Sequence, residues 1–176
     1  MTTVGLLALL LGLQVTISDL AARRVSNGVL AVTLALVLFL QLSHNAAPVG
    51  LASCLAGGVL GLLVLLPFHV IGWMGAGDVK LFATIGFLLG TKALLPIWVI
   101  ASLAAGVHAL LVVAWPLLSS SAPGMQRRVA GWGNTGWIRD WRMDLRSTRQ
   151  GRRGIPYAAY LGLAMIGYVL QGASHG

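Results

Sequence analysis

Six apolar runs, separated by short polar or glycine-rich segments, constrain this chain more than any other feature. A helix that spans a bilayer needs about 20 residues. The first, third, fifth and sixth runs reach or approach that length, whereas the second and fourth must include flanking residues. The runs cover residues 2–18, 29–43, 51–72, 79–90, 93–118 and 155–171. The pattern predicts an all-α fold, a polytopic membrane bundle of about six transmembrane helices.

The composition agrees with a membrane environment. Of the 176 residues, 57% are hydrophobic and 9% are charged, whereas soluble domains carry about 25% charged residues. A water-soluble fold would lack the polar side chains to cover its surface, so we interpret residues 1–176 as a single membrane-embedded domain. The one cysteine, Cys54, excludes an intramolecular disulfide, and the lack of a Cys-x-x-Cys pair excludes a zinc knuckle.

The basic residues indicate the orientation in the membrane. Arg23 and Arg24 follow the first apolar run and no basic residue precedes it, so the positive-inside rule places the N-terminus outside and these arginines in the cytoplasm. With six spans, Lys80 and the loop at 119–154 also face the cytoplasm, and of the twelve lysines and arginines only Lys92 is external. The net charge of +8 therefore reflects orientation, and nucleic acid is not expected as a partner.

The loop at 119–154 is the only extended polar region. Within it Trp137, Trp141 and Leu145 recur at four-residue spacing with arginines between them. This spacing predicts a basic amphipathic helix on the inner membrane surface. Two roles fit such a helix: an anchor to anionic lipids, or a docking surface for a substrate or partner.

The chain has four acidic residues, all of them aspartates. Asp140 and Asp144 lie among the arginines of the loop, where solvated ion pairs account for them. Asp19 closes the first apolar run and Asp78 opens the fourth, so the expected topology brings both to the cytoplasmic end of their helices. Ionisable groups at membrane depth are costly and mark functional sites.

Each of these two aspartates also has a purely structural interpretation. Asp19 could pair with Arg23 four residues on, and Asp78 could cap a helix that starts at Val79. Two carboxylates that meet cannot both ionise cheaply, so they share a proton and titrate as a unit. One can then act as base on a water while the other donates to a peptide carbonyl oxygen. This is aspartic-protease chemistry, which needs no metal or cofactor.

Glycines precede Asp78 in the segment Gly72-Trp73-Met74-Gly75-Ala76-Gly77-Asp78-Val79-Lys80-Leu81. Gly75 and Gly77 permit a non-helical path and a close approach of the backbone, which would give an extended substrate room beside the carboxylate. The segment also predicts a helix that begins in a protein-lined cavity rather than in lipid. A Gly-x-Gly-Asp pattern by itself is short enough to recur by chance.

Three motifs in chain order resemble those of the type IV prepilin peptidases, the bacterial GxGD aspartic peptidases. They are Asp19 to Asn27, GAGDVKL at 75–81 followed by Gly86 and Gly90, and Arg153-Gly154-Ile155-Pro156-Tyr157. Ser26 and Ala158 stand where the family commonly has proline and glycine, which bears on helix entry rather than on the carboxylates. The methyltransferase-type region of longer members, with its cysteine pairs, is absent, so the chain is similar to the short form that serves Flp/Tad pili.

The resemblance implies an intramembrane aspartic endopeptidase that removes the leader of type IV prepilins at the cytoplasmic face of the bacterial inner membrane. Asp19 and Asp78 would be the catalytic pair, with Gly75 and Gly77 shaping the site. Lys80 would face lipid head groups or the substrate, or simply snorkel to the interface. Supporting hydrogen bonds would come from Arg24, Asn27, Lys80 and Tyr157. The implied partners are the prepilin, membrane lipids and the pilus-assembly machinery, and no cofactor or metal is implied.

Other interpretations of the same residues remain open. A small transporter or proton relay would also use paired intramembrane carboxylates, although the chain shows no repeat-related halves. A non-catalytic membrane scaffold would explain the helices and leave the Gly-x-Gly-Asp context to chance. Peptidases of the presenilin kind carry a Tyr-Asp motif, whereas Ser18 precedes Asp19 here.

The remaining distinctive residues are assigned structural roles. The four histidines, which include His69 and His108 within apolar runs, have no metal-ligand spacing. Gly57, Gly58 and Gly61 are predicted to let two helices approach closely, because small residues bring backbones together in lipid.

Overall fold

The chain folds into a bundle of α-helices. The computed structural model describes residues 2–22, 24–42, 50–119 and 156–174, and none of these residues forms a strand. The helices are α1 (Thr3–Ala22), α2 (Asn27–Leu42), α3 (Leu51–Val70), α4 (Ala76–Leu89), α5 (Thr91–Ser119) and α8 (Tyr157–Ser174). Each of the six apolar runs therefore becomes one helix, and the predicted all-α membrane bundle is confirmed. The surface helix predicted around Trp137, Trp141 and Leu145 lies outside the described residues.

Three of the helices are long and apolar enough to cross a bilayer. They cover Thr3–Ala22, Leu51–Val70 and Thr91–Val112, and two shorter apolar helices cover Asn27–Leu42 and Tyr157–Ala173. Large hydrophobic side chains stay exposed along the outer faces, as Leu6, Leu10, Leu13 and Ile17 do on α1. Such a surface is stable in lipid and not in water, because lipid tails are as apolar as the side chains they touch.

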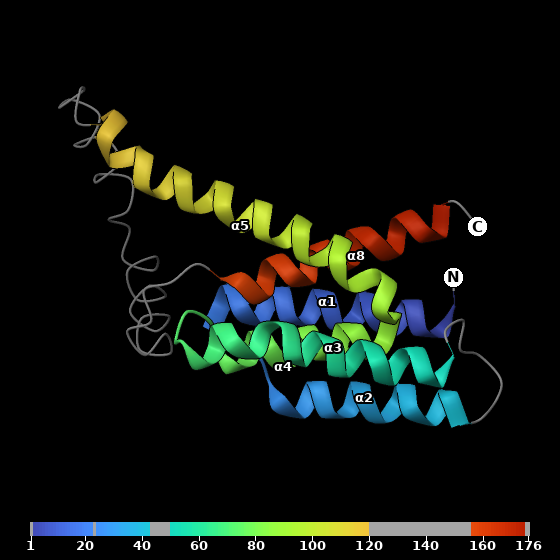
Figure 1. The fold of residues 1–176 in the computed structure, drawn as a ribbon. Coiled ribbons are helices and arrows are strands. Elements are labelled where there is room, and N and C mark those ends of the chain that lie inside the picture. The colour runs from blue at the N-terminus through green and yellow to red at the C-terminus, as the bar shows by residue number, and fades with distance from the viewer. Residues whose placement is uncertain (1, 23, 43–49, 120–155, 175–176) are drawn as a thin grey trace.

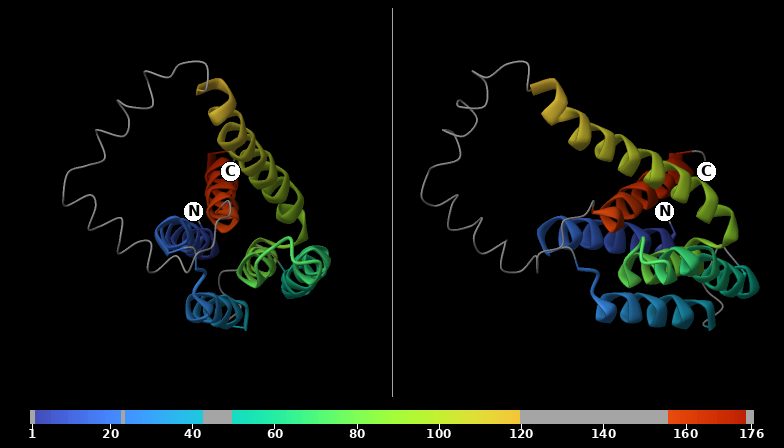
Figure 2. Two further views of the ribbon diagram at one scale, coloured as in Figure 1. Left: turned by 90° about the vertical axis from the view of Figure 1, so that its left-hand side faces the viewer. Right: turned by 60° about the vertical axis from the view of Figure 1, so that its left-hand side comes forward.

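Helix α4 lies at the centre of the bundle. It contacts each of the other five described helices, and half of its 14 residues are buried, among them Leu81, Phe82 and Ile85. Figure 2, viewed along the helices, shows α3 beside α4 and α1 beside α8, with α2 below them. Because protein surrounds α4, this helix does not need the length of a lipid-exposed span.

Glycine contacts set the distances between the packed helices. A Cβ added to Gly57 of α3 would overlap the backbone carbonyl of Gly86 on α4, and one added to Gly61 would lie 2.9 Å from the Phe82 carbonyl oxygen. On α1 and α8, a Cβ at Gly162 would lie 2.8 Å from the Gly12 carbonyl oxygen. The predicted packing role of Gly57 and Gly61 is thus confirmed, whereas the contact between α1 and α8 was not anticipated.

The direction of the helices brings the loops of interest to one end of the bundle. Helices α1 and α3 end there, and α2, α4 and α8 begin there, whereas the start of α1 and the end of α8 lie at the opposite end (Figure 1). We call the first of these the cavity end. An up-and-down arrangement with both termini on one side is what six alternating spans require.

Candidate active site

A cavity of about 800 Å³ opens at the cavity end of the bundle. Its walls come from the end of α1, the linker before α2, the segment between α3 and α4, the middle of α5 and the start of α8. Every site residue expected from the sequence lines it, namely Asp19, Arg24, Asn27, Gly75, Gly77, Asp78, Lys80 and Tyr157. Residues spread over most of the chain therefore share one space.

Asp19 is a nearly buried carboxylate held by another helix. Its side chain is 6% exposed, and its Oδ2 accepts a hydrogen bond of 2.9 Å from the backbone N–H of Ala159 in the first turn of α8. The first N–H groups of a helix have no partner within the helix, so Asp19 supplies one from α1. The expected alternative, a pair with Arg23, concerns a residue outside the described part of the chain.

Asp78 caps the helix on which it lies. Helix α4 begins at Ala76, three residues earlier than the Val79 expected from the apolar run. Asp78 is thus the third helical residue, and its Oδ2 accepts a hydrogen bond of 3.2 Å from the Gly75 N–H. Asp78 therefore caps the helix as expected, but the helix starts about one turn earlier than predicted. A carboxylate at the third helical position binds the N–H before the helix, which lets the helix extend into the glycine segment.

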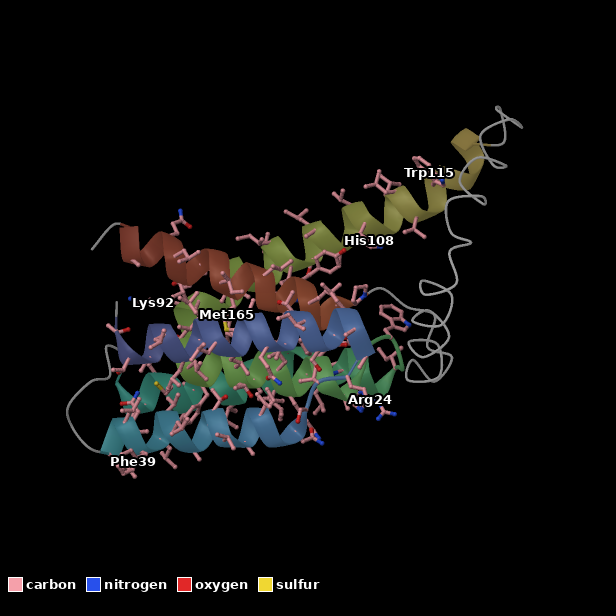
Figure 3. All side chains as sticks on the ribbon, turned by 180° about the vertical axis from the view of Figure 1, so that it is seen from behind. Arg24, Phe39, Lys92, His108, Trp115 and Met165 are labelled. Atoms are coloured by element: carbon pink, nitrogen blue, oxygen red, sulfur yellow. The ribbon has the colours of Figure 1, made fainter. Side chains whose placement is uncertain are left out.

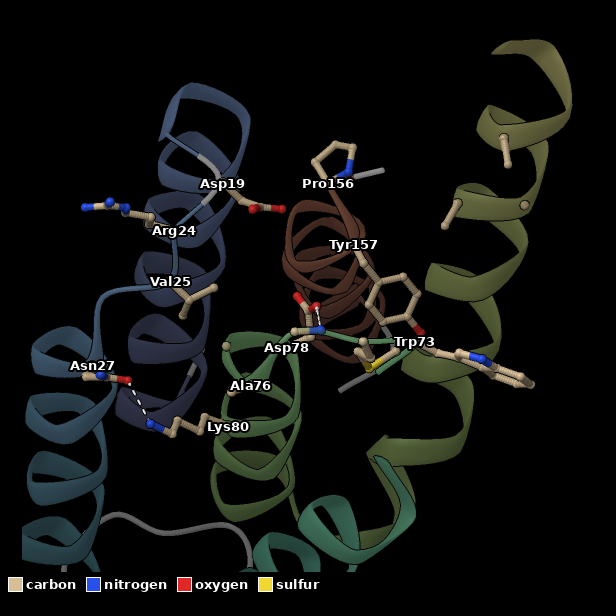
Figure 4. Close-up of a pocket in the computed structure, with 16 residues that line it drawn as sticks. Asp19, Arg24, Val25, Asn27, Trp73, Ala76, Asp78, Lys80, Pro156 and Tyr157 are labelled. Carbon is tan, nitrogen blue, oxygen red and sulfur yellow. Dashed lines mark hydrogen bonds between the residues drawn. The ribbon is translucent and has the colours of Figure 1, made fainter. Parts of the chain in front are cut away.

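The two carboxylates have one electrostatic feature in common. Each accepts a hydrogen bond at a helix N-terminus, Asp19 at α8 and Asp78 at α4. The N-terminal end of a helix carries a partial positive charge of roughly half an elementary charge. This arrangement stabilises negative charge on two acids that face the same space, and Figure 4 shows both side chains directed into the cavity from different walls.

The glycines shape the cavity by lacking side chains. A Cβ at Gly75 would lie 3.2 Å from Asp78 Oδ2, and one at Gly77 would lie 3.3 Å from the Val25 Cβ. Contacts this short are tighter than side chains normally adopt, so a larger residue at Gly75 would crowd the carboxylate. Gly72 takes a left-handed conformation with φ of 85°, which glycine adopts without steric cost and which turns the chain from α3 toward α4.

The other polar residues on the cavity wall bond mainly to one another and to neighbouring helices. Lys80 Nζ donates to Asn27 Oδ1 over 3.3 Å and joins α4 to the start of α2. The Tyr157 hydroxyl and Ser102 Oγ lie 3.0 Å apart, which joins α8 to α5. Arg24 lines the cavity, but Figure 4 shows its guanidinium pointing away from Asp19. Direct support of the carboxylates by these side chains stays a prediction.

Some features of the site were missed in the sequence. Ala105, Gly106 and Ala109 of α5 form part of the wall, and their spacing of about one helical turn was a signal for a narrow face of small residues. The Ala159 N–H that binds Asp19 left no signal, because every residue except proline has such a group. Among the described residues, no three histidine, cysteine or acidic side chains gather in a metal-binding group.

The fold and the cavity define the class of protein to which this chain belongs. The chain is a polytopic helical membrane protein with two aspartates in a cavity that opens at one end of the bundle. A sequence model of the type IV leader peptidase family matches residues 6–110, which is more than half of the chain and includes both aspartates. The chain belongs to the type IV leader peptidase family, and it is therefore a membrane peptidase. No curated protein and no solved structure matches it.

Proposed function

We propose that this chain is an aspartic endopeptidase that removes the leader peptide of type IV, Flp-like prepilins at the cytoplasmic membrane face. The observation that carries the proposal is that Asp19 and Asp78, the only acids among the described residues, line the same cavity. Membership of the leader peptidase family supports the substrate class. The defining experiment is leader removal from a co-expressed prepilin, followed by its shift on a gel.

The chemistry follows from the properties of a carboxylate pair. The ionised member takes a proton from a water, whose oxygen attacks the carbonyl carbon of the scissile peptide bond. The protonated member donates to the carbonyl oxygen, which gives a tetrahedral intermediate. The intermediate collapses when the C–N bond breaks: the carboxyl that took the water proton gives it to the leaving nitrogen, and the other carboxylate takes a hydroxyl proton from the intermediate, which restores the pair. The cavity at the end of the bundle supplies the water that this reaction consumes.

The placement of the basic residues supports a cytoplasmic site. Arg24 and Lys80 line the cavity, whereas Lys92 lies at the start of α5, near the opposite end of the bundle, as Figure 3 shows. The positive-inside rule assigns the side richer in lysine and arginine to the cytoplasm. The cavity then opens toward the compartment where the prepilin leader lies before cleavage.

Reporter fusions test this orientation. A fusion after residue 48 should report the external side and one after residue 135 the cytoplasmic side, because an alternating bundle places the two loops on opposite faces of the membrane. The measurement compares a reporter that is active only outside with one that is active only inside. Reports from the same side for both fusions would contradict the orientation and the cytoplasmic site with it.

The pH dependence tests the carboxylate mechanism. Cleavage should follow a bell-shaped profile, because one carboxylate must be ionised while the other holds a proton. Metal chelators and serine-directed reagents should leave the rate unchanged. The measurement is the initial rate of leader removal by purified protein across pH, with and without each reagent. Strong inhibition by a chelator that added metal reverses would replace the aspartic mechanism with a metal-dependent one.

A further inference from the structure

The first turn of α8 makes hydrogen bonds to two other helices. Three of them join Tyr157 to Ser102 of α5, Ala159 to Asp19 of α1, and Tyr160 to His108 of α5. In a fourth, Thr16 Oγ1 of α1 donates to the Ala159 carbonyl oxygen over 3.5 Å. The first turn of a helix has N–H groups without intrahelical partners and is prone to fray. Here the hydroxyls of Tyr157 and Tyr160 hold this turn against α5, and the Ala159 N–H binds the Asp19 carboxylate.

His108 has no role in the proposed peptide hydrolysis, so its presence in α5 needs another explanation. It is an ionisable side chain in a helix that is long and apolar enough to cross the bilayer, and such residues are costly in lipid unless they have a partner. Its Nδ1 bonds to the Tyr160 hydroxyl, and the two rings meet edge to face with centroids 5.8 Å apart. Ala105 and Ala109, which flank it on α5, line the catalytic cavity.

The bond between His108 and Tyr160 lies at a position on α5 where it can affect how α8 is placed. Beyond His108, the α5 side chains Leu110, Leu111 and Val112 are exposed rather than packed against the bundle. Figure 1 shows α5 leaving the bundle toward its C-terminal end. The bond between His108 and Tyr160 therefore lies near the point where α5 departs from α8. Without it, this turn keeps the bonds of Tyr157 to α5 and of Ala159 to α1 but loses its attachment to α5 at Tyr160.

We propose that His108 and Tyr160 are positioning residues for Asp19, which act by fixing the first turn of α8 and with it the Ala159 N–H. A hydrogen bond weakens steeply when its donor turns away from the acceptor, so movement of this turn changes the direction of the carboxylate. This inference rests on the proposed function insofar as Asp19 takes part in cleavage. The placement of α8 itself can be tested without any peptidase activity.

The first test compares Tyr160→Phe with Tyr168→Phe, a matched change further along α8 at a residue packed against the core. Phenylalanine keeps the ring and removes only the hydroxyl. We expect Tyr160→Phe to lower kcat about tenfold with KM nearly unchanged, because misplacement of a catalytic group by a fraction of an ångström reduces turnover. Tyr168→Phe should leave both constants near wild type. Equal losses in the two variants, or loss of stability with kcat unchanged, would overturn the proposal.

The second test exchanges the partner on α5. His108→Asn keeps a hydrogen-bonding group near the position of Nδ1, whereas His108→Leu removes it. The asparagine variant should retain most of the turnover and the leucine variant should match Tyr160→Phe. Combining His108→Leu with Tyr160→Phe should add little to either change, because both remove the same bond. Full activity of a folded His108→Leu protein would overturn the positioning role.

An activity-independent measurement separates this inference from the proposed function. Amide hydrogen exchange at Ala159, followed by NMR of the full chain in detergent, should be roughly fivefold faster in Tyr160→Phe than in wild type, as the loss of one hydrogen bond implies. Tyr168→Phe should leave it unchanged. If the wild-type protein cleaves no prepilin, the proposed function fails. The exchange rate at Ala159 then still tests whether the bond between Tyr160 and His108 fixes the first turn of α8. Unchanged exchange in Tyr160→Phe would overturn the inference.

Discussion

Replacing either Asp19 or Asp78 with asparagine is expected to abolish leader removal while the protein stays folded in the membrane. An amide cannot accept the proton of the attacking water or deliver one to the substrate, so the loss should be on the order of 10⁴-fold or more. The fold should survive, because an asparagine Oδ1 can still accept from the N–H of Ala159 or Gly75. The measurement is the gel shift of a co-expressed prepilin, with membrane levels of each variant checked.

Two controls sharpen this prediction. The double variant Asp19→Asn with Asp78→Asn should be no less active than either single variant, because residues that act as a unit are not additive. Asp144→Asn should cleave nearly as well as wild type, since the sequence predicts only a solvated ion pair for this aspartate and such pairs contribute roughly 0–1 kcal/mol. Full cleavage by a well-expressed Asp78→Asn protein would contradict the carboxylate-pair mechanism as proposed.

A third variant separates catalysis from capping. Asp19→Ala removes the acceptor of the Ala159 N–H in a buried setting, and an unsatisfied buried donor costs about 1–3 kcal/mol. Asp19→Ala should therefore be inactive and also less stable than the inactive Asp19→Asn. Equal thermal stability of the two proteins in detergent would show that the bond to α8 contributes little to folding.

The second large effect is expected at the contact between α3 and α4. Gly57→Ala should destabilise the protein by about 3 kcal/mol or more, toward the upper end of the cost of overpacking, because the added methyl group meets the backbone of Gly86. Backbone cannot move aside as a flexible side chain can. The two helices must then separate, and the displacement carries Asp78 at the start of α4 with it, so activity should fall as well.

The matched control is the same substitution where space is available. A Cβ at Gly167 of α8 meets nothing within 4 Å, and alanine in an open helical position is favoured over glycine by up to about 1 kcal/mol. Gly167→Ala should therefore melt at or slightly above the wild-type temperature. The readout is loss of soluble protein on heating in detergent, and equal melting of the two variants would contradict the close approach of α3 and α4.

The sequence by itself determined which of the described segments are helices and which ionisable residues are candidates for the site. Apolar runs of the right length specify membrane helices because lipid leaves the backbone few other ways to satisfy its hydrogen bonds. Alternating spans bring the end of one helix and the start of the next to the same side of the bundle, so the order of the apolar runs was enough to predict Asp19 and Asp78 at one end of it. Both line the same cavity, although their catalytic role stays a proposal.

Only the tertiary structure decided how the helices pair and what holds each carboxylate. Glycines at Gly12 and Gly162 permit close approach, but a small residue does not specify its partner. Asp19 is bound by a backbone N–H of Ala159, 140 positions further along the chain. Backbone groups are the same at nearly every residue, so no side-chain pattern marks the one that folding brings to a given acid. That choice depends on the packing of α1 against α8, which is a property of the whole bundle.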